Sequence, residues 1–117
     1  MEKNVSISIH LDFYGKLLSD RKNEIMDYYY NDDLSLAEIA EIIGISRQGV
    51  RDIIKRCEKE LFYMEERLGM IARFEKTAKN IAEIKKIAHK IDFEAKNNKE
   101  IHKSASDIIR IADSIEE

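Results

Sequence analysis

The side chains of this sequence that are best suited to a chemical task stand between residues 46 and 60, and most of them are basic. Arg47, Arg51 and Lys55 follow one another at intervals of four residues, which places them along one stripe of an α-helix. Gln48 stands beside that stripe. Arginine can donate two hydrogen bonds to the edge of guanine, and glutamine can pair with adenine in a similar way. The spacing therefore predicts a helix surface that can contact the base edges of a nucleic acid.

Further polar residues flank this stripe. Arg56 and Lys59 suit contacts with phosphate, which position a protein on nucleic acid without reading its sequence. The nucleic-acid-binding residues that we expect are Arg47, Gln48, Arg51, Asp52, Lys55, Arg56 and Lys59. The alternative interpretation is a solvated helix surface on which Arg51 and Lys55 pair with acidic neighbours.

Residues that usually carry catalysis or bind metals are scattered along the chain. His10, His89 and His102 are far apart, and none stands at a metal-ligand spacing from Cys57. His89 and Asp92 can share a helix face, where a solvated pair explains them. There is no glycine-rich phosphate loop, nucleophile elbow or zinc motif, and Cys57 falls on the predicted core side of its helix, as a small buried hydrophobe does. We therefore expect no enzymatic activity, no cofactor and no metal.

The composition favours an all-α protein. The chain has 117 residues, no proline and four glycines, and its apolar residues recur at intervals of three and four. Its 20 basic and 23 acidic residues leave a net charge of −3, whereas a strong nucleic-acid binder usually carries a basic footprint. Any contact with nucleic acid is therefore expected to be local, and weak for one copy of the chain.

The sequence also favours a cytoplasmic location without membrane association. No apolar run approaches the roughly 18 residues that span a membrane, and the N-terminus lacks the features of a secretion signal. The single cysteine cannot form an internal disulfide, which agrees with a reducing compartment.

Residues 35–56 carry the marks of a helix-turn-helix. Ser35 and Glu38 have the spacing of a capping box, and Ser46 is placed to cap the second helix. Gly44 stands at the turn between them, where a positive φ angle is needed. The apolar positions that hold two such helices together are filled by Ile39, Ala40, Ile43, Ile45, Val50 and Ile53.

The chain before this motif is expected to begin with a flexible arm. Val5, Ile7 and Ile9 alternate with polar residues, but five residues without a partner strand favour a loose segment over residues 1–10. From residue 11 the spacing is helical, with Leu11, Tyr14, Leu17 and Leu18 on one face, and Ser19 then caps a helix that runs to about Tyr30. The predicted helix-turn-helix domain covers residues 11–68.

Residues 69–117 form a predicted C-terminal helical arm. Apolar residues alternate at four- and three-residue steps from Met70 to Ala95, which is the seam of a coiled coil. "KNNK" interrupts the seam, which resumes from Ile101 to Ile115, so the simplest arrangement is an antiparallel hairpin. The seam either completes the domain core or faces a partner. We expect a homodimer through Ile81, Ile84, Ile91 and parts of residues 101–115, because the long first helix would otherwise overhang the small domain.

Three stretches carry a resemblance to known families. "LLSDRKNEIMDYYYNDDLSLAEIAEIIGISRQGVRDIIKRCEKEL" resembles, in layout, the promoter-reading part of bacterial sigma factors. "DFYGKLL", "YYYNDDLSLAEIAE" and "SRQGVRDIIKR" resemble the YlxM family of small bacterial helix-turn-helix proteins over about residues 11–68. The residues that match the central motif of that family are Ser46, Arg47, Gln48, Val50, Asp52, Ile54, Lys55 and Arg56. Arg51 departs from the motif, in which an aromatic residue is expected.

The resemblance implies a biological setting. Genes of the YlxM family lie beside those of the signal recognition particle, with a suggested regulatory role in that pathway, and its members form helical dimers. Our leading hypothesis is a regulatory protein that binds DNA or the signal recognition RNA. The competing hypothesis is a protein-interaction module that acts on the GTPase or the RNA–protein particle of the pathway without touching bases.

Overall fold

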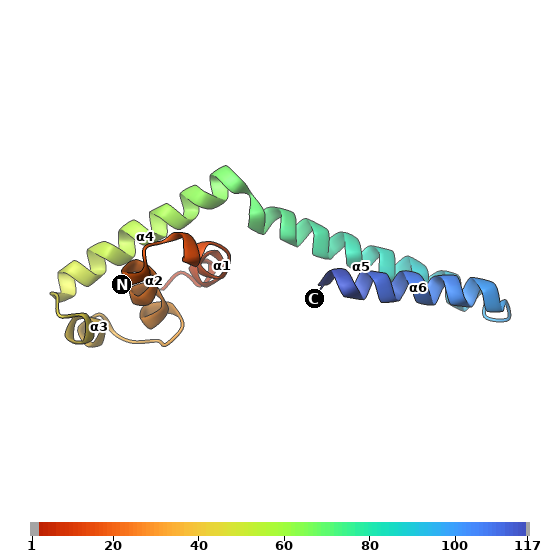
Figure 1. Cartoon of the computed structure of the whole chain (residues 1–117), viewed down its shortest axis with the longest axis horizontal. Coiled ribbons are helices and arrows are strands. Elements are labelled where there is room, and N and C mark those ends of the chain that lie inside the picture. The colour runs from red at the N-terminus through yellow and green to blue at the C-terminus, as the bar shows by residue number, and fades with distance from the viewer. Residues whose placement is uncertain (1–2, 117) are drawn as a thin grey trace. The chain divides into compact units, whose positions relative to one another are not determined.

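The computed structural model describes residues 3–116, which fold into α-helices joined by short turns (Figure 1). The elements in chain order are α1 (Val5–Tyr14), a 3-10 helix η1 (Gly15–Leu17), α2 (Asp20–Tyr30), α3 (Leu36–Ile43), α4 (Arg47–Leu68), α5 (Met70–Glu94) and α6 (Lys99–Glu116). No strand occurs among the described residues. The predicted fold class, an all-α helix-turn-helix bundle followed by a helical hairpin, is confirmed.

The chain divides into two compact units. Residues up to Ile71 form the first unit, which contains α1 to α4, and the second unit begins at Ala72. The predicted boundary at residues 68 and 69 lies just before this division, at Gly69, which ends α4 in the left-handed conformation with a φ of 61°.

The core of the first unit forms where α1, α2 and α3 pack against α4. The side chains that lose all contact with solvent are Tyr14, Ile7, Ile25, Met26, Ile39, Ile54, Leu61, Val50 and Cys57. They come from four different helices, so each helix contributes one apolar side to a common interior. The remaining sides of α4 are left for other contacts.

The predicted flexible arm over residues 1–10 is wrong for the residues that the structure describes. Helix α1 begins at Val5, and the Asn4 side chain caps it by accepting a hydrogen bond from the Ser6 amide at 3.0 Å. Ile7 is completely buried and shares one helical side with Leu11 and Tyr14. The packing of this side outweighs the alternating sequence, because a short isolated strand would leave its backbone unpaired.

The same region contains a second difference from the prediction. Leu17 is 62% exposed, although the helical spacing places it on the apolar face with Leu11. The reason is that α1 ends at Tyr14 and the tighter turn η1 follows, which rotates later side chains away from the direction that a continuous α-helix would give. Leu18 is nevertheless buried.

The predicted caps are confirmed. Ser19 accepts a hydrogen bond from the Lys22 amide at the start of α2. Ser35 and Glu38 form a reciprocal capping box at the start of α3. Gly44 has a φ of 84° and ends α3, so the turn of the helix-turn-helix has the left-handed residue that it requires.

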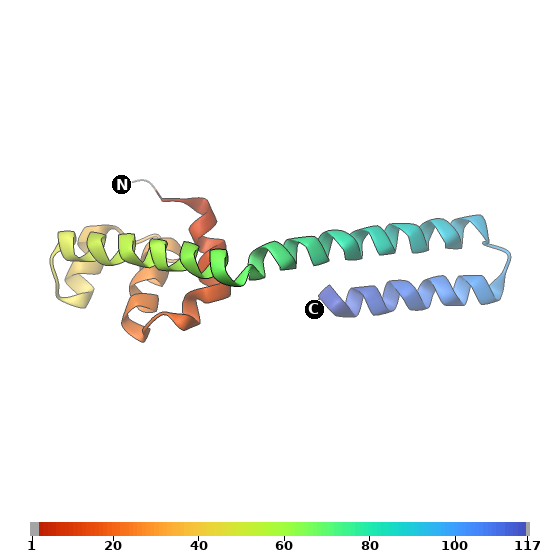
Figure 2. The same ribbon diagram turned by 90° about the horizontal axis from the view of Figure 1, so that it is seen from above.

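In the second unit, α5 and α6 run antiparallel side by side (Figures 1 and 2). Lys85 of α5 forms an ion pair with Asp113 of α6 at 2.7 Å, and His102 of α6 contacts Asp92 of α5 at 2.5 Å. Asn98 starts α6 by accepting hydrogen bonds from the amides of residues 100 and 101, both at 3.1 Å. The predicted break at "KNNK" therefore becomes the turn of the hairpin.

Small side chains form the inside of the hairpin. Ala88, Ala105 and Ala112 are at most 3% exposed, and Ile81 is 5% exposed. The larger seam residues remain substantially exposed, namely Ile84, Ile91, Ile101, Ile108 and Ile115. Part of the predicted seam is thus used within the chain, while its isoleucines other than Ile81 keep apolar surface in contact with solvent.

Candidate nucleic-acid interface

Helix α4 presents the candidate interface because only one of its sides is buried. Its start is fixed by Ser46, whose hydroxyl accepts a hydrogen bond from the Gly49 amide at 3.0 Å. Val50, Ile54 and Leu61 are fully buried against the other helices of the first unit. The exposed surface between Arg47 and Lys59 carries every residue that the sequence predicted for nucleic-acid binding.

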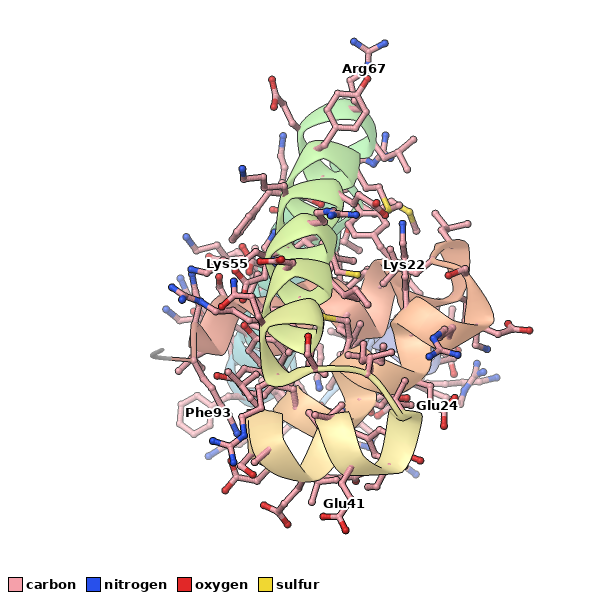
Figure 3. All side chains as sticks on the ribbon, turned by 90° about the vertical axis from the view of Figure 1, so that its left-hand side faces the viewer. Lys22, Glu24, Glu41, Lys55, Arg67 and Phe93 are labelled. Carbon is pink, nitrogen blue, oxygen red and sulfur yellow. The ribbon has the colours of Figure 1, made fainter. Side chains whose placement is uncertain are left out.

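The seven predicted residues are all exposed. They are Arg47, Gln48, Arg51, Asp52, Lys55, Arg56 and Lys59. Figure 3 shows Lys55 projecting from the flank of α4 that lies away from Lys22 of α2. The structure thus brings the predicted set together on the accessible surface of one helix.

The five cations of this surface have no carboxylate partner among the described residues. Within residues 3–116, none of Arg47, Arg51, Lys55, Arg56 and Lys59 forms an ion pair. The alternative interpretation from the sequence, in which Arg51 and Lys55 pair with acidic neighbours, is therefore not what this part of the chain shows. Unpaired exposed cations keep their full charge available for an anionic ligand.

Three carboxylates of the same helix bind groups of α1, α2 or the start of α5. Glu58 accepts a hydrogen bond from the Tyr30 hydroxyl, and Glu60 pairs with the Lys22 ammonium at 2.9 Å. Glu65 accepts hydrogen bonds from the Tyr14 hydroxyl at 2.5 Å and from the Ile71 amide at 2.9 Å. Three negative charges of α4 are therefore directed toward the body of the unit.

These contacts change the acidity of the groups involved. The hydrogen bond and the charge of Glu60 raise the pKa of Lys22. Burial and the hydrogen bond to Glu65 raise the pKa of Tyr14, and burial followed by the hydrogen bond to Glu58 raises that of Tyr30. Both phenols therefore remain neutral donors to their carboxylates at neutral pH.

Gln48 and Asp52 are joined within the surface. The Gln48 side-chain nitrogen donates a hydrogen bond to the Asp52 carboxylate at 3.0 Å. Asp52 is the single acidic member of the predicted set. Its carboxylate is therefore held by a neighbour with a spacing of four residues on the same helix.

The other candidate groups found in the sequence form no reactive cluster. Cys57 is buried, and this burial is the main cause that raises its pKa to about 11. The predicted pairing of His89 with Asp92 is wrong, because Asp92 contacts His102 across the hairpin. No group of three potential metal ligands occurs within residues 3–116. No helix in this range is long and apolar enough to cross a membrane.

The inward role of Glu58 and Glu65 was missed by sequence reasoning. The two residues stand seven positions apart, on either side of the buried Leu61. A separation of seven residues returns to nearly the same side of a helix. This spacing is a signal that the carboxylates flank the core.

Comparison with known proteins identifies the family. A family model described as "Putative helix-turn-helix protein, YlxM / p13 like" matches residues 1–104. The chain belongs to this YlxM/p13-like family, UPF0122. The match covers both the helix-turn-helix and most of the hairpin, whereas the resemblance in the sequence covered residues 11–68.

Individual members of UPF0122 agree with this assignment. A family protein of Clostridium kluyveri is 49% identical over 86 residues, which is 74% of each chain. A member from Acetivibrio thermocellus is 48% identical over 92 residues, or 79% of each chain. A third, from Caldanaerobacter subterraneus subsp. tengcongensis, is 50% identical over 74 residues, or 63% of each chain. The YlxM/p13-like family is described as a helix-turn-helix family.

Proposed function

We propose that this protein is a cytoplasmic regulator that binds duplex DNA through the exposed side of α4 between Arg47 and Lys59. The observation that carries the proposal is the separation of charge on that helix. Five exposed cations have no ion-pair partner within residues 3–116, while Glu58, Glu60 and Glu65 are directed to groups of the first unit or the start of α5. A chain with a net charge of −3 thereby presents a locally basic surface to phosphate.

The helix-turn-helix supports DNA as the ligand. In this motif the second helix enters the major groove with its N-terminal residues at the base edges. Arg47, Gln48 and Arg51 occupy that end of α4, and their side chains can pair with guanine or adenine. Arg56 and Lys59 lie further along and suit the flanking phosphates.

The biological setting that we propose is the signal recognition particle pathway. It rests on the resemblance to the YlxM family, whose genes lie beside those of this particle. The regulated target is then either a promoter in this gene neighbourhood or the signal recognition RNA itself.

A binding titration tests the nucleic-acid proposal. Fluorescence anisotropy would be measured with random duplex DNA and, separately, with the signal recognition RNA, at about 50 mM and 200 mM salt. We expect duplex binding that weakens steeply at the higher salt, because each phosphate contact releases counterions. The proposal would be refuted if the protein bound neither the duplex DNA nor the RNA at the lower salt.

Charge-reversal variants identify the binding surface. Arg47→Glu with Arg51→Glu should abolish binding at either salt concentration. The matched control is Lys16→Glu with Arg21→Glu, which changes the net charge equally at two exposed residues outside α4. Equal loss in both double variants would indicate a general charge effect and not a defined interface.

The same variants decide about the second candidate function, an interaction module of the signal recognition particle. That function is favoured by the exposed aromatic side chains of Phe62 and Tyr63, which are 42% and 59% exposed further along α4. Capture of the purified particle by immobilised protein would be compared for both double variants. Capture that persists in the Arg47→Glu/Arg51→Glu variant after its nucleic-acid binding is lost would establish an interaction module in addition to the DNA reader. Capture by a wild-type protein that binds neither nucleic acid would establish the module in place of the reader.

We also propose that the protein acts as a homodimer through its hairpin. A groove of about 180 Å³ between α5 and α6 is lined by Ile81, Ile84, Ile108, Ile111, Ala112 and Ile115. Two hairpins that cover each other's grooves would form a four-helix arrangement, and a two-fold dimer would present two recognition helices. Because Ile81 is already buried within the hairpin, the dimer contacts that we expect come from its exposed neighbours.

A further inference from the structure

Asp52 is out of place on a surface that binds phosphate. It stands among four exposed cations within about two and a half turns of α4, namely Arg47, Arg51, Lys55 and Arg56. A carboxylate at this position repels phosphate and weakens binding to any duplex. Its contribution must therefore be sought in something other than affinity.

Among the residues that the structure describes, Asp52 has one hydrogen-bond partner, the side-chain nitrogen of Gln48 at 3.0 Å. An ionised carboxylate only accepts hydrogen bonds, whereas an amide has a nitrogen that donates and an oxygen that accepts. The contact is therefore favourable for only one orientation of the Gln48 amide. The nitrogen must face Asp52, and the oxygen must point away from it.

This orientation has a consequence for base recognition. Adenine offers a donor and an acceptor in the major groove, and a glutamine amide matches them with its oxygen and one N–H. Guanine offers two acceptors at the same edge, so an amide oxygen that is held toward it meets another oxygen. An amide that can rotate freely can present its nitrogen to guanine instead. Fixing the amide thus favours adenine over guanine.

We propose that Asp52 is a positioning residue that makes Gln48 selective for adenine. The inference rests on the proposed DNA-binding function and adds to it the base that one residue reads. Asp52 contributes no contact to the base. It restricts the orientations of the side chain that does.

The first step of the test locates the base. Random duplexes would be selected with the wild-type protein and with Gln48→Ala, and the position at which only the wild type prefers adenine would be identified. Two duplexes that differ only by A·T or G·C at that position would then be titrated by fluorescence anisotropy. The wild type should prefer the A·T duplex by about tenfold, as expected for one good bidentate pair.

The variants then separate positioning from simple charge. In Asp52→Asn the preference should fall to about twofold, because an asparagine both donates and accepts and no longer selects one amide orientation. Affinity for random duplex should rise at the same time, since a negative charge is removed. A structural defect would lower both the adenine preference and the affinity for random duplex. A lower preference together with a higher affinity therefore indicates a positioning role.

Three controls complete the experiment. Glu66→Gln removes the same charge from an exposed residue of α4, about 21 Å further along the helix axis, and should leave the preference unchanged. Asp52→Glu keeps a side chain that only accepts hydrogen bonds, so it should retain part of the adenine preference that Asp52→Asn loses. In the Gln48→Ala background, Asp52→Asn should have no further effect on the preference. Circular dichroism would check that each variant retains its helices.

The outcomes distinguish this inference from the function on which it rests. If the wild type bound no duplex at low salt, both the proposed DNA-binding function and the role of Asp52 would be overturned. Retention of duplex with an adenine preference that Asp52→Asn leaves unchanged would overturn the role of Asp52 alone. Loss of preference in Glu66→Gln to the same extent would also overturn it, because charge in general would then be the cause.

Discussion

Tyr14 links α1 to the beginning of α5 within the first unit through its hydroxyl. The side chain is fully buried, and its hydroxyl donates to Glu65 and accepts from the Met70 amide at 3.0 Å. Glu65 also accepts from the Ile71 amide. One carboxylate and one phenol thus satisfy two backbone N–H groups at the helix start, which would otherwise lack partners.

Replacement of Tyr14 by phenylalanine should destabilise the protein. The apolar ring contacts remain, but the Met70 amide and the Glu65 carboxylate each lose a hydrogen bond, so the melting temperature should fall by roughly 5 °C. Thermal unfolding followed by circular dichroism measures this change. Tyr63→Phe is the control, because Tyr63 is 59% exposed. Equal melting temperatures for wild type and Tyr14→Phe would contradict the linking role.

Cys57 should be unreactive in the folded protein. Its pKa is raised from the ordinary 9.0 to about 11, chiefly by burial, and the thiolate is the nucleophilic form. Modification by a thiol reagent at pH 8 should therefore be slow in buffer and fast in denaturant. A rapid reaction of the folded protein would show that this part of the core opens readily.

The same pKa shift predicts a decrease in stability under alkaline conditions. The unfolded chain releases the thiol proton near pH 9, whereas the folded chain holds it until about pH 11. The stabilising contribution is thus complete below pH 9 and is lost as the pH rises toward 11. Denaturant unfolding of wild type and Cys57→Ser at pH 8 and pH 10 measures it. We expect the wild type to lose more stability than the variant over this interval.

At the scale of the elements, the turn between α3 and α4 depends on a single glycine. Gly44 has a φ of 84°, which costs a residue with a side chain about 1–2 kcal/mol. Gly44→Ala should therefore lower the free energy of unfolding by about this amount, although no atom beyond its chain neighbours lies within 4 Å of the position of the added methyl group. Denaturant unfolding provides the measurement.

Gly49 provides the comparison for this prediction. It lies within α4, where alanine is favoured over glycine by about 1 kcal/mol, but an added methyl group would meet the Ser46 hydroxyl oxygen at 3.2 Å. The two effects oppose each other, so Gly49→Ala should change the stability much less than Gly44→Ala. A larger loss at Gly49 would show that the cap made by Ser46 cannot adjust.

Helix α1 should be required for the stability of the first unit. Ile7 is fully buried and Ile9 is 44% exposed. Ile7→Ala should lower the free energy of unfolding by about 2–4 kcal/mol, as for other large-to-small changes in a core, while Ile9→Ala should cost less than about 1 kcal/mol. Similar values for both variants would support a loose N-terminal segment instead.

At the scale of the whole molecule, the proposed homodimer makes a prediction about mass. Light scattering at micromolar concentration should report about twice the chain mass of 13.7 kDa. Ile84→Glu should reduce the mass to that of one chain, because it places a charge in the apolar groove, where Ile84 is 48% exposed. Lys86→Glu is the control at an exposed charged residue of the same helix. A wild-type protein with the mass of one chain would refute the dimer.

The sequence alone determined the features that depend on contacts within one or two helical turns. The caps at Ser19, Ser35 and Ser46 and the left-handed turn at Gly44 are local, because a short side chain bonds an amide two or three residues away. The exposed position of the basic residues on α4 followed from the same local periodicity. The fold class and the family were therefore predictable before the structure.

Tertiary structure decided the features that depend on which surfaces meet. Val5 to Ile9 became helical because Ile7 has a core to enter, and no local signal outweighed the alternating pattern. Asp92 contacts His102 because α6 folds back along α5, and Glu58 contacts Tyr30 across the gap between two helices. Partners such as these are separated by ten or more residues along the chain, so burial and charge pairing between helices select them and local spacing cannot.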